Sequence, residues 1–157
     1  MDLKLEVIVL PVSDVDRAKD FYEKAGFRQD ADAVVGDGYR VVQYTPPGSE
    51  CAIIFGKGIT SATPGSAQGL YLIVQDVEEA RAELVGRGVE VGEVFHDGGG
   101  VFVHGHGPGG AVGYPEGSRQ VSGPHPERAD YGSYAAFSDP DGNGWMLQEV
   151  KKRAPGR

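Results

Sequence analysis

The spacing of apolar positions changes along the first 56 residues of the chain. Apolar and polar residues alternate loosely over residues 3–12, which is typical of a β-strand. Over residues 14–25 the apolar positions recur three and four residues apart, which predicts an amphipathic helix. Asp14 can cap the first turn of this helix, and Gly26 can adopt the left-handed conformation that ends it. We therefore expect a strand followed by a helix over residues 14–25.

Three short β-rich runs follow the predicted helix. They span residues 27–35, 39–45 and 51–55. The turn-forming residues Gly36-Asp37-Gly38 and Pro46-Pro47-Gly48 separate them. Residues 1–56 thus form a strand, helix and three strands, and the Gly-, Ser-, Thr- and Pro-containing stretch 57–68 reads as a linker.

The same plan recurs in the second half of the chain. Val12-Ser13-Asp14-Val15-Asp16-Arg17-Ala18 aligns with Val74-Gln75-Asp76-Val77-Glu78-Glu79-Ala80, and Gly26 then meets Gly88. A second module is therefore expected over 69–150, with a helix over 77–85 and strands over 70–74, 89–95, 134–137 and 145–150. A chain of 157 residues has the usual size of one domain, so we expect both modules in a single domain.

A glycine-rich insertion over residues 96–132 interrupts this symmetry. It contains runs such as Gly98-Gly99-Gly100, together with His104, His106 and His125. A loop of this length inside a compact domain is often a lid or a binding loop, and we favour such a role over simple disorder.

The charge balance and the first residues of the chain bear on its binding partners and its cellular location. Acidic residues outnumber basic ones by 23 to 15, and the net charge of −8 disfavours both nucleic acid and anionic membranes as partners. The first residues do not resemble a secretory signal, so we predict a cytoplasmic protein. Cys51, the only cysteine, lies in an apolar run and reads as a core residue.

Two stretches of the chain carry a family resemblance. Pro11-Val12-Ser13-Asp14-Val15-Asp16-Arg17-Ala18-Lys19-Asp20-Phe21-Tyr22 and Phe137-Ser138-Asp139-Pro140-Asp141-Gly142-Asn143 resemble the vicinal oxygen chelate superfamily. That superfamily holds glyoxalases, bleomycin-resistance proteins and extradiol dioxygenases. The resemblance implies an α+β fold of two βαβββ modules whose four-stranded sheets form a paired, curved mixed β-sheet cleft, the glyoxalase/bleomycin resistance/dihydroxybiphenyl dioxygenase-like fold. It also implies a homodimer.

Glyoxalase-like enzymes of this superfamily hold a divalent metal in the cleft through His and Glu side chains. The corresponding positions here are Val7, Gly69 and Met146, which offer no suitable donor for a hard cation. We therefore expect no cofactor at the usual positions. A divalent metal held by His104 and His106 stays open as an alternative, because this spacing places both imidazoles on one side of an extended segment.

Aromatic and apolar residues of the predicted strands are candidates for a ligand pocket. They are Tyr44, Phe55, Tyr71, Trp145 and Met146. Trp145 and Met146 are adjacent and cannot both face the cleft from a regular strand.

The leading hypothesis is a small-molecule-binding protein of the glyoxalase/bleomycin-resistance type that sequesters an antibiotic or metabolite. The alternative is a glyoxalase-like lyase or a dioxygenase-type enzyme. Such an enzyme would be metal-free, with Glu6 or a loop histidine as acid or base, or would hold a metal through His104 and His106. A non-catalytic structural or regulatory domain is a third reading.

Overall fold

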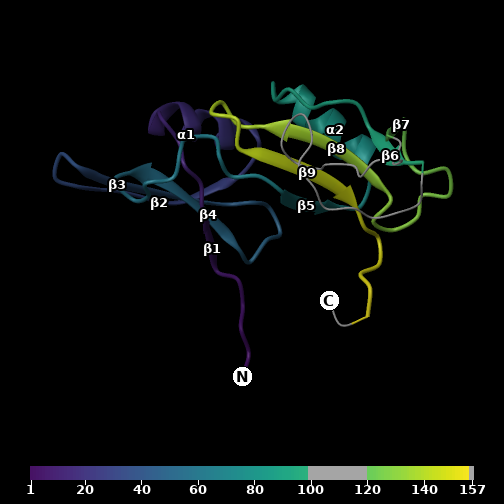
Figure 1. Ribbon diagram of the computed structural model, residues 1–157, viewed down its shortest axis with the longest axis horizontal. Coiled ribbons are helices and arrows are strands. Elements are labelled where there is room, and N and C mark those ends of the chain that lie inside the picture. Colours follow the sequence, from purple (N-terminus) through teal and green to yellow (C-terminus); the bar gives the residue numbers. More distant parts are fainter. Residues whose placement is uncertain (99–119, 156–157) are drawn as a thin grey trace. The chain divides into compact units, whose positions relative to one another are not determined.

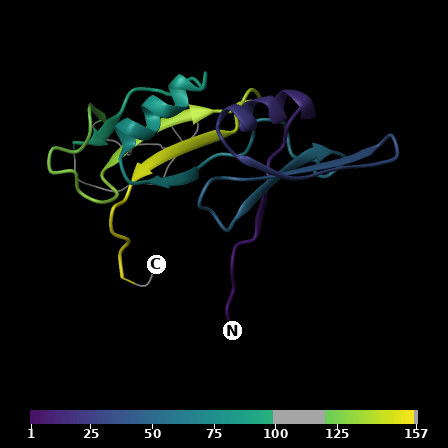
Figure 2. The same cartoon turned by 180° about the vertical axis from the view of Figure 1, so that it is seen from behind.

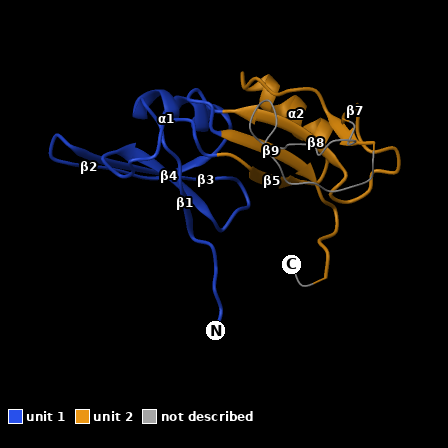
Figure 3. Cartoon of the chain, in the orientation of Figure 1, with its two compact units in different colours: residues 1–67, 139–143 blue, residues 68–138, 144–157 orange. Residues whose placement is uncertain are grey.

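The computed structural model describes residues 1–98 and 120–155 (Figure 1). The chain divides into two compact units, which are coloured separately in Figure 3. Unit 1 comprises residues 1–67 and 139–143, and unit 2 comprises residues 68–138 and 144–157. Within residues 1–98 and 120–155, each unit contains one helix and one mixed sheet, as the repeat in the sequence predicts.

Unit 1 follows the predicted order of strand, helix and three strands. Its elements are β1 (Val7–Val9), α1 (Val15–Lys24), β2 (Arg28–Val35), β3 (Tyr39–Thr45) and β4 (Ala52–Lys57). The sheet has the order β1-β4-β3-β2, with β1 parallel to β4 and the other pairs antiparallel. Helix α1 lies against one face of this sheet, as Figure 2 shows from behind.

The predicted helix over residues 14–25 is confirmed, and its cap is the expected one. The Asp14 side chain accepts a hydrogen bond from the backbone N–H of Arg17, which satisfies a donor of the first turn. Ala18 and Tyr22 are buried against the sheet. The Tyr22 ring lies 5.5 Å from the Phe55 ring, measured between centroids, so the helix and β4 share an aromatic core.

The turn at residues 139–143 belongs to unit 1. The Tyr22 hydroxyl donates to the buried Asp139 carboxylate over 2.9 Å. The other oxygen of that carboxylate accepts from the backbone N–H groups of Asp141 and Asn143. The Asn143 side-chain amide donates to the Pro11 carbonyl over 2.9 Å. The predicted tight turn thus carries buried polar groups that are paired with α1 and with the segment that precedes it.

Unit 2 repeats the plan with additions. Its elements are β5 (Leu70–Val74), α2 (Val77–Gly86), β6 (Phe95–Asp97), β7 (Gln120–Ser122), β8 (Ser133–Ser138) and β9 (Gly144–Glu149). Its sheet has the order β5-β9-β8-β6-β7. The Asp76 side chain caps α2 by accepting from the N–H groups of Glu78 and Glu79. Among the described residues, no helix is long and apolar enough to cross a membrane.

Two predictions for unit 2 need correction. The strand expected over residues 89–95 is wrong for most of its length, because β6 begins only at Phe95 and Val91 forms a single isolated bridge with Phe137. The predicted insertion 96–132 contains part of β6 and all of β7, so the sheet has five strands rather than four. Local alternation could not reveal β7, because its pairing with β6 joins residues far apart in the sequence.

Candidate ligand pocket

The face of the second sheet that points away from α2 carries a cluster of large side chains. Strand register places Met146 beside both Tyr71 and Ala136, and Phe95 beside Tyr134. Phe95, Tyr134 and Met146 form a buried hydrophobic cluster, and Tyr71 and Ala136 pack against it. The rings of Phe95 and Tyr134 are stacked at 5.5 Å between centroids. We call this surface the aromatic face of unit 2.

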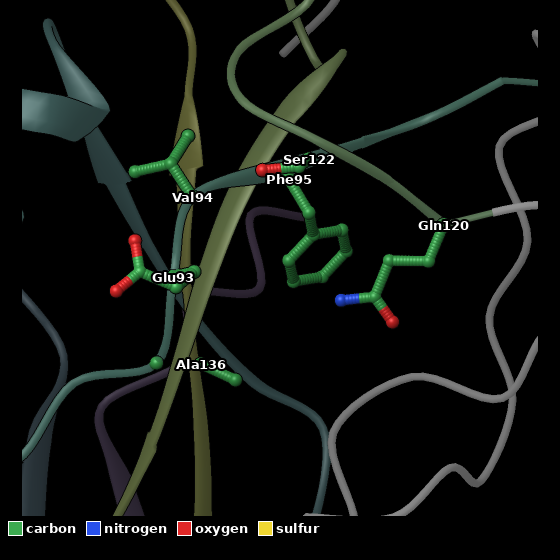
Figure 4. A pocket seen from close by; sticks show the side chains of 7 residues that line it. Glu93, Val94, Phe95, Gln120, Ser122 and Ala136 are labelled. Carbon is green, nitrogen blue, oxygen red and sulfur yellow. The ribbon is translucent and has the colours of Figure 1, made fainter.

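A pocket of about 330 Å³ adjoins the aromatic face. Figure 4 shows its lining, which consists of Gly92, Glu93, Val94, Phe95, Gln120, Ser122 and Ala136. Phe95 and Ala136 belong to both the pocket and the aromatic face. The side chains of Phe95 and Gln120 point toward one another in Figure 4. An apolar wall with a few polar groups is the usual construction of a site for a small organic molecule.

Two tyrosines and one glutamate are the ionisable side chains that we consider near the pocket. Burial raises the pKa of Tyr134 to about 12, and burial also raises the pKa of Tyr71, so both phenols stay neutral near pH 7. The Tyr134 hydroxyl donates to the carbonyl of Tyr131. Glu93 forms an ion pair with Arg81, with 2.9 Å between nitrogen and oxygen. The two neutral phenols can contact a ligand through hydrogen bonds and apolar surface, and neither is a base near pH 7.

The predicted ligand-binding residues fall on two different faces. Tyr71 and Met146 belong to the aromatic face. Tyr44 and Phe55 are fully buried on the helix side of the first sheet, where the Tyr44 hydroxyl donates to Glu23 of α1. Trp145 lies on the helix side of the second sheet, and its ring stacks on Phe137. Tyr44, Phe55 and Trp145 thus lie on the helix sides of their sheets, and of the five predicted residues only Tyr71 and Met146 lie on the face that adjoins the pocket.

The resemblance implies that Val7, Gly69 and Met146 correspond to the positions that hold a metal in glyoxalase-like enzymes. Val7 lies in β1, Gly69 immediately precedes β5, and Met146 lies buried in the aromatic face. None of these side chains is a ligand for a hard cation, so we derive no chemistry through a metal at these positions. Within residues 1–98 and 120–155, no group of three or more His, Cys, Asp or Glu side chains could hold a metal ion.

The nearby carboxylate Glu149 points to the opposite face from Met146, as strand alternation predicts. It is fully buried and accepts from the backbone N–H of Val77 and from the guanidinium of Arg128. The hydrogen bond from Arg128 is the largest cause, and together with the bond from Val77 it lowers the pKa of Glu149 to about 2. Glu149 therefore fixes the first residue of α2 by accepting its backbone N–H.

Of the predicted catalytic candidates, only Glu6 is among the described residues, and it does not line the pocket. Glu6 is exposed just before β1, and its carbonyl accepts from the Ala52 N–H. His104 and His106 lie outside the described residues. Two other histidines of the glycine-rich region, His96 and His125, lie with their rings 5.9 Å apart. His96 Nδ1 is 2.8 Å from the Gly123 carbonyl oxygen, so this ring is engaged in holding the turn after β7.

Sequence reasoning missed most of the pocket lining. Gln120 and Ser122 lie in β7, inside a region read as a loop, and Glu93 and Val94 lie where a regular strand was expected. The alternation of Tyr134 and Ala136 along β8 was an available signal, because residues two apart on a strand share one face, and Ala136 lies opposite Met146. That signal would have identified the aromatic face, but not the pocket, because most of the pocket residues lie outside β8 and β9.

Comparisons with known proteins agree with this architecture. The family model described as Glyoxalase/Bleomycin resistance protein/Dioxygenase superfamily matches residues 4–110. The crystal structure of TnmS3, an antibiotic binding protein from Streptomyces sp. CB03234, is 30% identical, with a TM-score of 0.62, covering 95% of this chain and 97% of TnmS3.

Two further solved structures are similar. A glyoxalase/bleomycin resistance protein from Streptomyces sp. CB03234 is 31% identical, with a TM-score of 0.59, covering 93% of this chain and 100% of that one. A member of the superfamily from Sphaerobacter thermophilus DSM 20745 is 26% identical, with a TM-score of 0.59, covering 94% of this chain and 98% of that one. No curated protein matches the chain.

Proposed function

This chain belongs to the Glyoxalase/Bleomycin resistance protein/Dioxygenase superfamily, and on that premise we propose that it is a small-molecule-binding protein. The ligand occupies the pocket of unit 2 and contacts the adjoining aromatic face. Binding sequesters the ligand, an antibiotic or a metabolite, without converting it.

The observation that carries the proposal is the pocket of about 330 Å³ beside a cluster of aromatic and sulfur-containing side chains. This volume lies at the lower end of the range for small-molecule sites, about 300–1,000 Å³. The Phe95 ring offers a flat apolar surface for an unsaturated ligand, and Val94 and Ala136 add aliphatic groups to the same pocket. These groups favour an organic ligand with an aromatic or otherwise apolar body.

Polar groups at the rim supply orientation. Gln120 provides an amide donor and acceptor, and Ser122 lines the same pocket from β7. The neutral phenols of Tyr71 and Tyr134 add no charge to the aromatic face. A ligand therefore meets a mainly uncharged surface with few polar anchors, which suits binding better than acid or base chemistry.

The similar structures support the class of ligand. TnmS3 is described as an antibiotic binding protein. At 30% identity over nearly the whole of both chains, this likeness makes an antibiotic the first ligand class to test. The expectation that no metal is needed rests on the side chains at Val7, Gly69 and Met146 and stays a prediction.

The alternative is a glyoxalase-like lyase or dioxygenase relative, metal-free or with a metal held by His104 and His106. Family membership alone favours it, because the same fold hosts both binding proteins and enzymes. Turnover of the methylglyoxal–glutathione adduct on addition of Ni²⁺ or Zn²⁺ would overturn the binding proposal. Loss of that turnover in Glu6→Gln, His104→Ala or His106→Ala would then identify the residues involved.

A fluorescence titration tests the proposed site directly. The probe is 1-anilinonaphthalene-8-sulfonate, an aromatic molecule whose emission rises in apolar surroundings. We expect saturable binding to the wild-type protein and at least a tenfold weaker affinity for Ala136→Trp, because the indole would fill the pocket. Ala33→Trp, the same change at an exposed position of β2, is the matched control and should bind as the wild type does. Equal binding by both variants would contradict the site.

A further inference from the structure

The wall of the pocket that β7 forms is held by few strand contacts. β7 lies at one end of the sheet order, and all three of its residues are exposed. Within the described part of the chain it pairs with β6 alone, over three residue pairs. A short edge strand with solvent-exposed backbone bonds opens easily. Gln120 and Ser122, which line the pocket from β7, therefore need a further attachment to stay in place.

His96 supplies such an attachment at the end of β7. It is the central residue of β6, and only 9% of it is exposed. Its Nδ1 atom lies 2.8 Å from the carbonyl oxygen of Gly123, the residue that directly follows β7. The Gly123 N–H donates to the Val94 carbonyl over 2.8 Å. The residue after β7 is thus fixed by one backbone bond and by the histidine ring.

The histidine acts from the face of β6 that lies opposite the pocket. Successive residues of a strand point to opposite faces, and Phe95 lines the pocket, so His96 points away from it. Ser122 is paired with Phe95 across the two strands and lines the same pocket. In Figure 4 the side chain of Gln120 points toward Phe95. Any effect of His96 on a ligand must therefore pass through the position of β7.

The contact requires one particular tautomer of His96. A carbonyl oxygen only accepts, so Nδ1 carries the proton and Nε2 is unprotonated in the neutral ring. The neighbouring ring of His125, 5.9 Å away between centroids, has the reverse arrangement, because its Nδ1 accepts from the Glu127 N–H over 3.2 Å. Backbone partners thus set the protons of both rings. His96 is a directed hydrogen-bond donor, which packing alone would not require.

We propose that His96 is a positioning residue of the ligand pocket. Its hydrogen bond to Gly123 holds β7 so that Gln120 and Ser122 stand across the pocket from Phe95. The inference rests on the proposed binding function, because it concerns the affinity of the same pocket. A wall that is already fixed need not be ordered when the ligand binds. Without the bond, the entropy lost in ordering β7 would offset part of the binding free energy.

A matched pair of variants tests the donor itself. Asn and Leu have nearly the same shape, but only the Asn amide has an N–H that can take the place of Nδ1. We expect His96→Leu to bind 1-anilinonaphthalene-8-sulfonate about fivefold to tenfold more weakly than the wild type. His96→Asn should stay within about twofold of the wild type. Equal affinities for the wild type and His96→Leu, or equal losses in both variants, would overturn the proposal.

Measurements without ligand separate this proposal from the proposed function. Nuclear magnetic resonance of the imidazole nitrogens should place the proton of neutral His96 on Nδ1, which needs no variant. Amide hydrogen exchange at Gly123 should be at least about fivefold faster in His96→Leu than in His96→Asn. A proton on Nε2, or equal exchange in the two variants, would overturn the role of His96. If both results hold but the wild type does not bind the probe, the binding function is contradicted while the attachment of β7 stands.

Discussion

Units 1 and 2 have the same module plan but anchor their helices with different groups. In unit 1 the Asp141 carboxylate accepts from the backbone and hydroxyl of Ser13 and pairs with Arg17, which is half-exposed. In unit 2 the fully buried Glu149 accepts from the Val77 N–H and pairs with Arg128. The same task, fixing the start of a helix, is performed near the surface in one unit and in the interior in the other.

The sheets differ in the faces that point away from the helices. In unit 1 this face carries Val9 and Ile54, and Val9 remains exposed. In unit 2 the corresponding face carries Met146 and Tyr134, both buried, with a pocket beside them. The proposed ligand site therefore lies in unit 2. Two modules with the same order of elements thus present differently built sheet faces.

The largest effect should come from breaking the buried anchor of unit 2. Glu149→Gln removes the charge that pairs with Arg128 and should lower the free energy of unfolding by about 3 kcal/mol. Trp145, the only tryptophan, lies buried in unit 2, so its fluorescence during urea unfolding reports this unit. Arg87→Ala, which removes an exposed ion pair with Glu83, is the control and should cost less than about 0.5 kcal/mol. Equal effects would contradict the role of Glu149.

Low pH should weaken the interaction of Glu149 with Arg128 and so lower the free energy of unfolding. The pKa of Glu149 is about 2 in the folded protein, below its ordinary value of 4.5, so its contribution to stability is present above pH 4.5 and is lost as the pH falls toward 2. Over this window the difference in unfolding free energy between the wild type and Glu149→Gln should shrink by about 2 kcal/mol. Urea titrations at a series of pH values measure it. A difference that stays constant down to pH 2 would show that Glu149 is not held as an ionised carboxylate.

A smaller effect is expected from the buried hydrogen bond of unit 1. Tyr22→Phe removes the hydroxyl that donates to Asp139 and should cost about 1.5 kcal/mol, because a hydrogen bond to a charged group is lost. Urea unfolding followed by far-ultraviolet circular dichroism measures this loss of unfolding free energy, since the signal reports the secondary structure of both units. Phe21→Leu, a change beside Tyr22 that leaves the hydrogen bond intact, is the comparison. If Tyr22→Phe proved neutral, the turn at residues 139–143 would not depend on this bond.

The smallest effect should come from the half-exposed anchor of unit 1. Arg17→Ala removes the ion pair with Asp141, while the hydrogen bonds from Ser13 to the same carboxylate remain. We expect a loss of about 0.5 kcal/mol, well below the loss for Arg128→Ala in unit 2. The ratio of the two losses in unfolding free energy measures how much more a buried carboxylate depends on its arginine than an accessible one does. A larger loss for Arg17→Ala than for Arg128→Ala would reverse the comparison.

Local signals in the sequence predicted the regular elements well. Asp14 and Asp76 each precede an apolar three- and four-residue pattern, and each caps a helix that begins at the next residue. The strands of unit 1 agree with their predicted ranges to within two residues at most ends, although β1 spans only Val7–Val9 of the expected 3–12. Caps, turns and alternation act within a few residues of one another, so the sequence shows them directly.

The pocket depends on contacts that the sequence does not show. Alternation divides each strand into two faces, but it does not say which face a helix will cover, and Tyr44, Phe55 and Trp145 were therefore assigned to the ligand although they pack the cores. Arg128 was not identified either. Its backbone has a φ of 49°, and its partners Asp76, Glu78 and Glu149 are distant in sequence. Such long-range pairings require the tertiary structure.

The most direct test of the account is a titration of isotope-labelled protein with 1-anilinonaphthalene-8-sulfonate, followed by amide chemical shifts in nuclear magnetic resonance spectra. We predict that the largest shifts fall on Phe95, Ala136 and the β7 residues Gln120 and Ser122. Shifts centred instead on the exposed face of unit 1, at Val9 and Ile54, would contradict the assignment of ligand binding to unit 2.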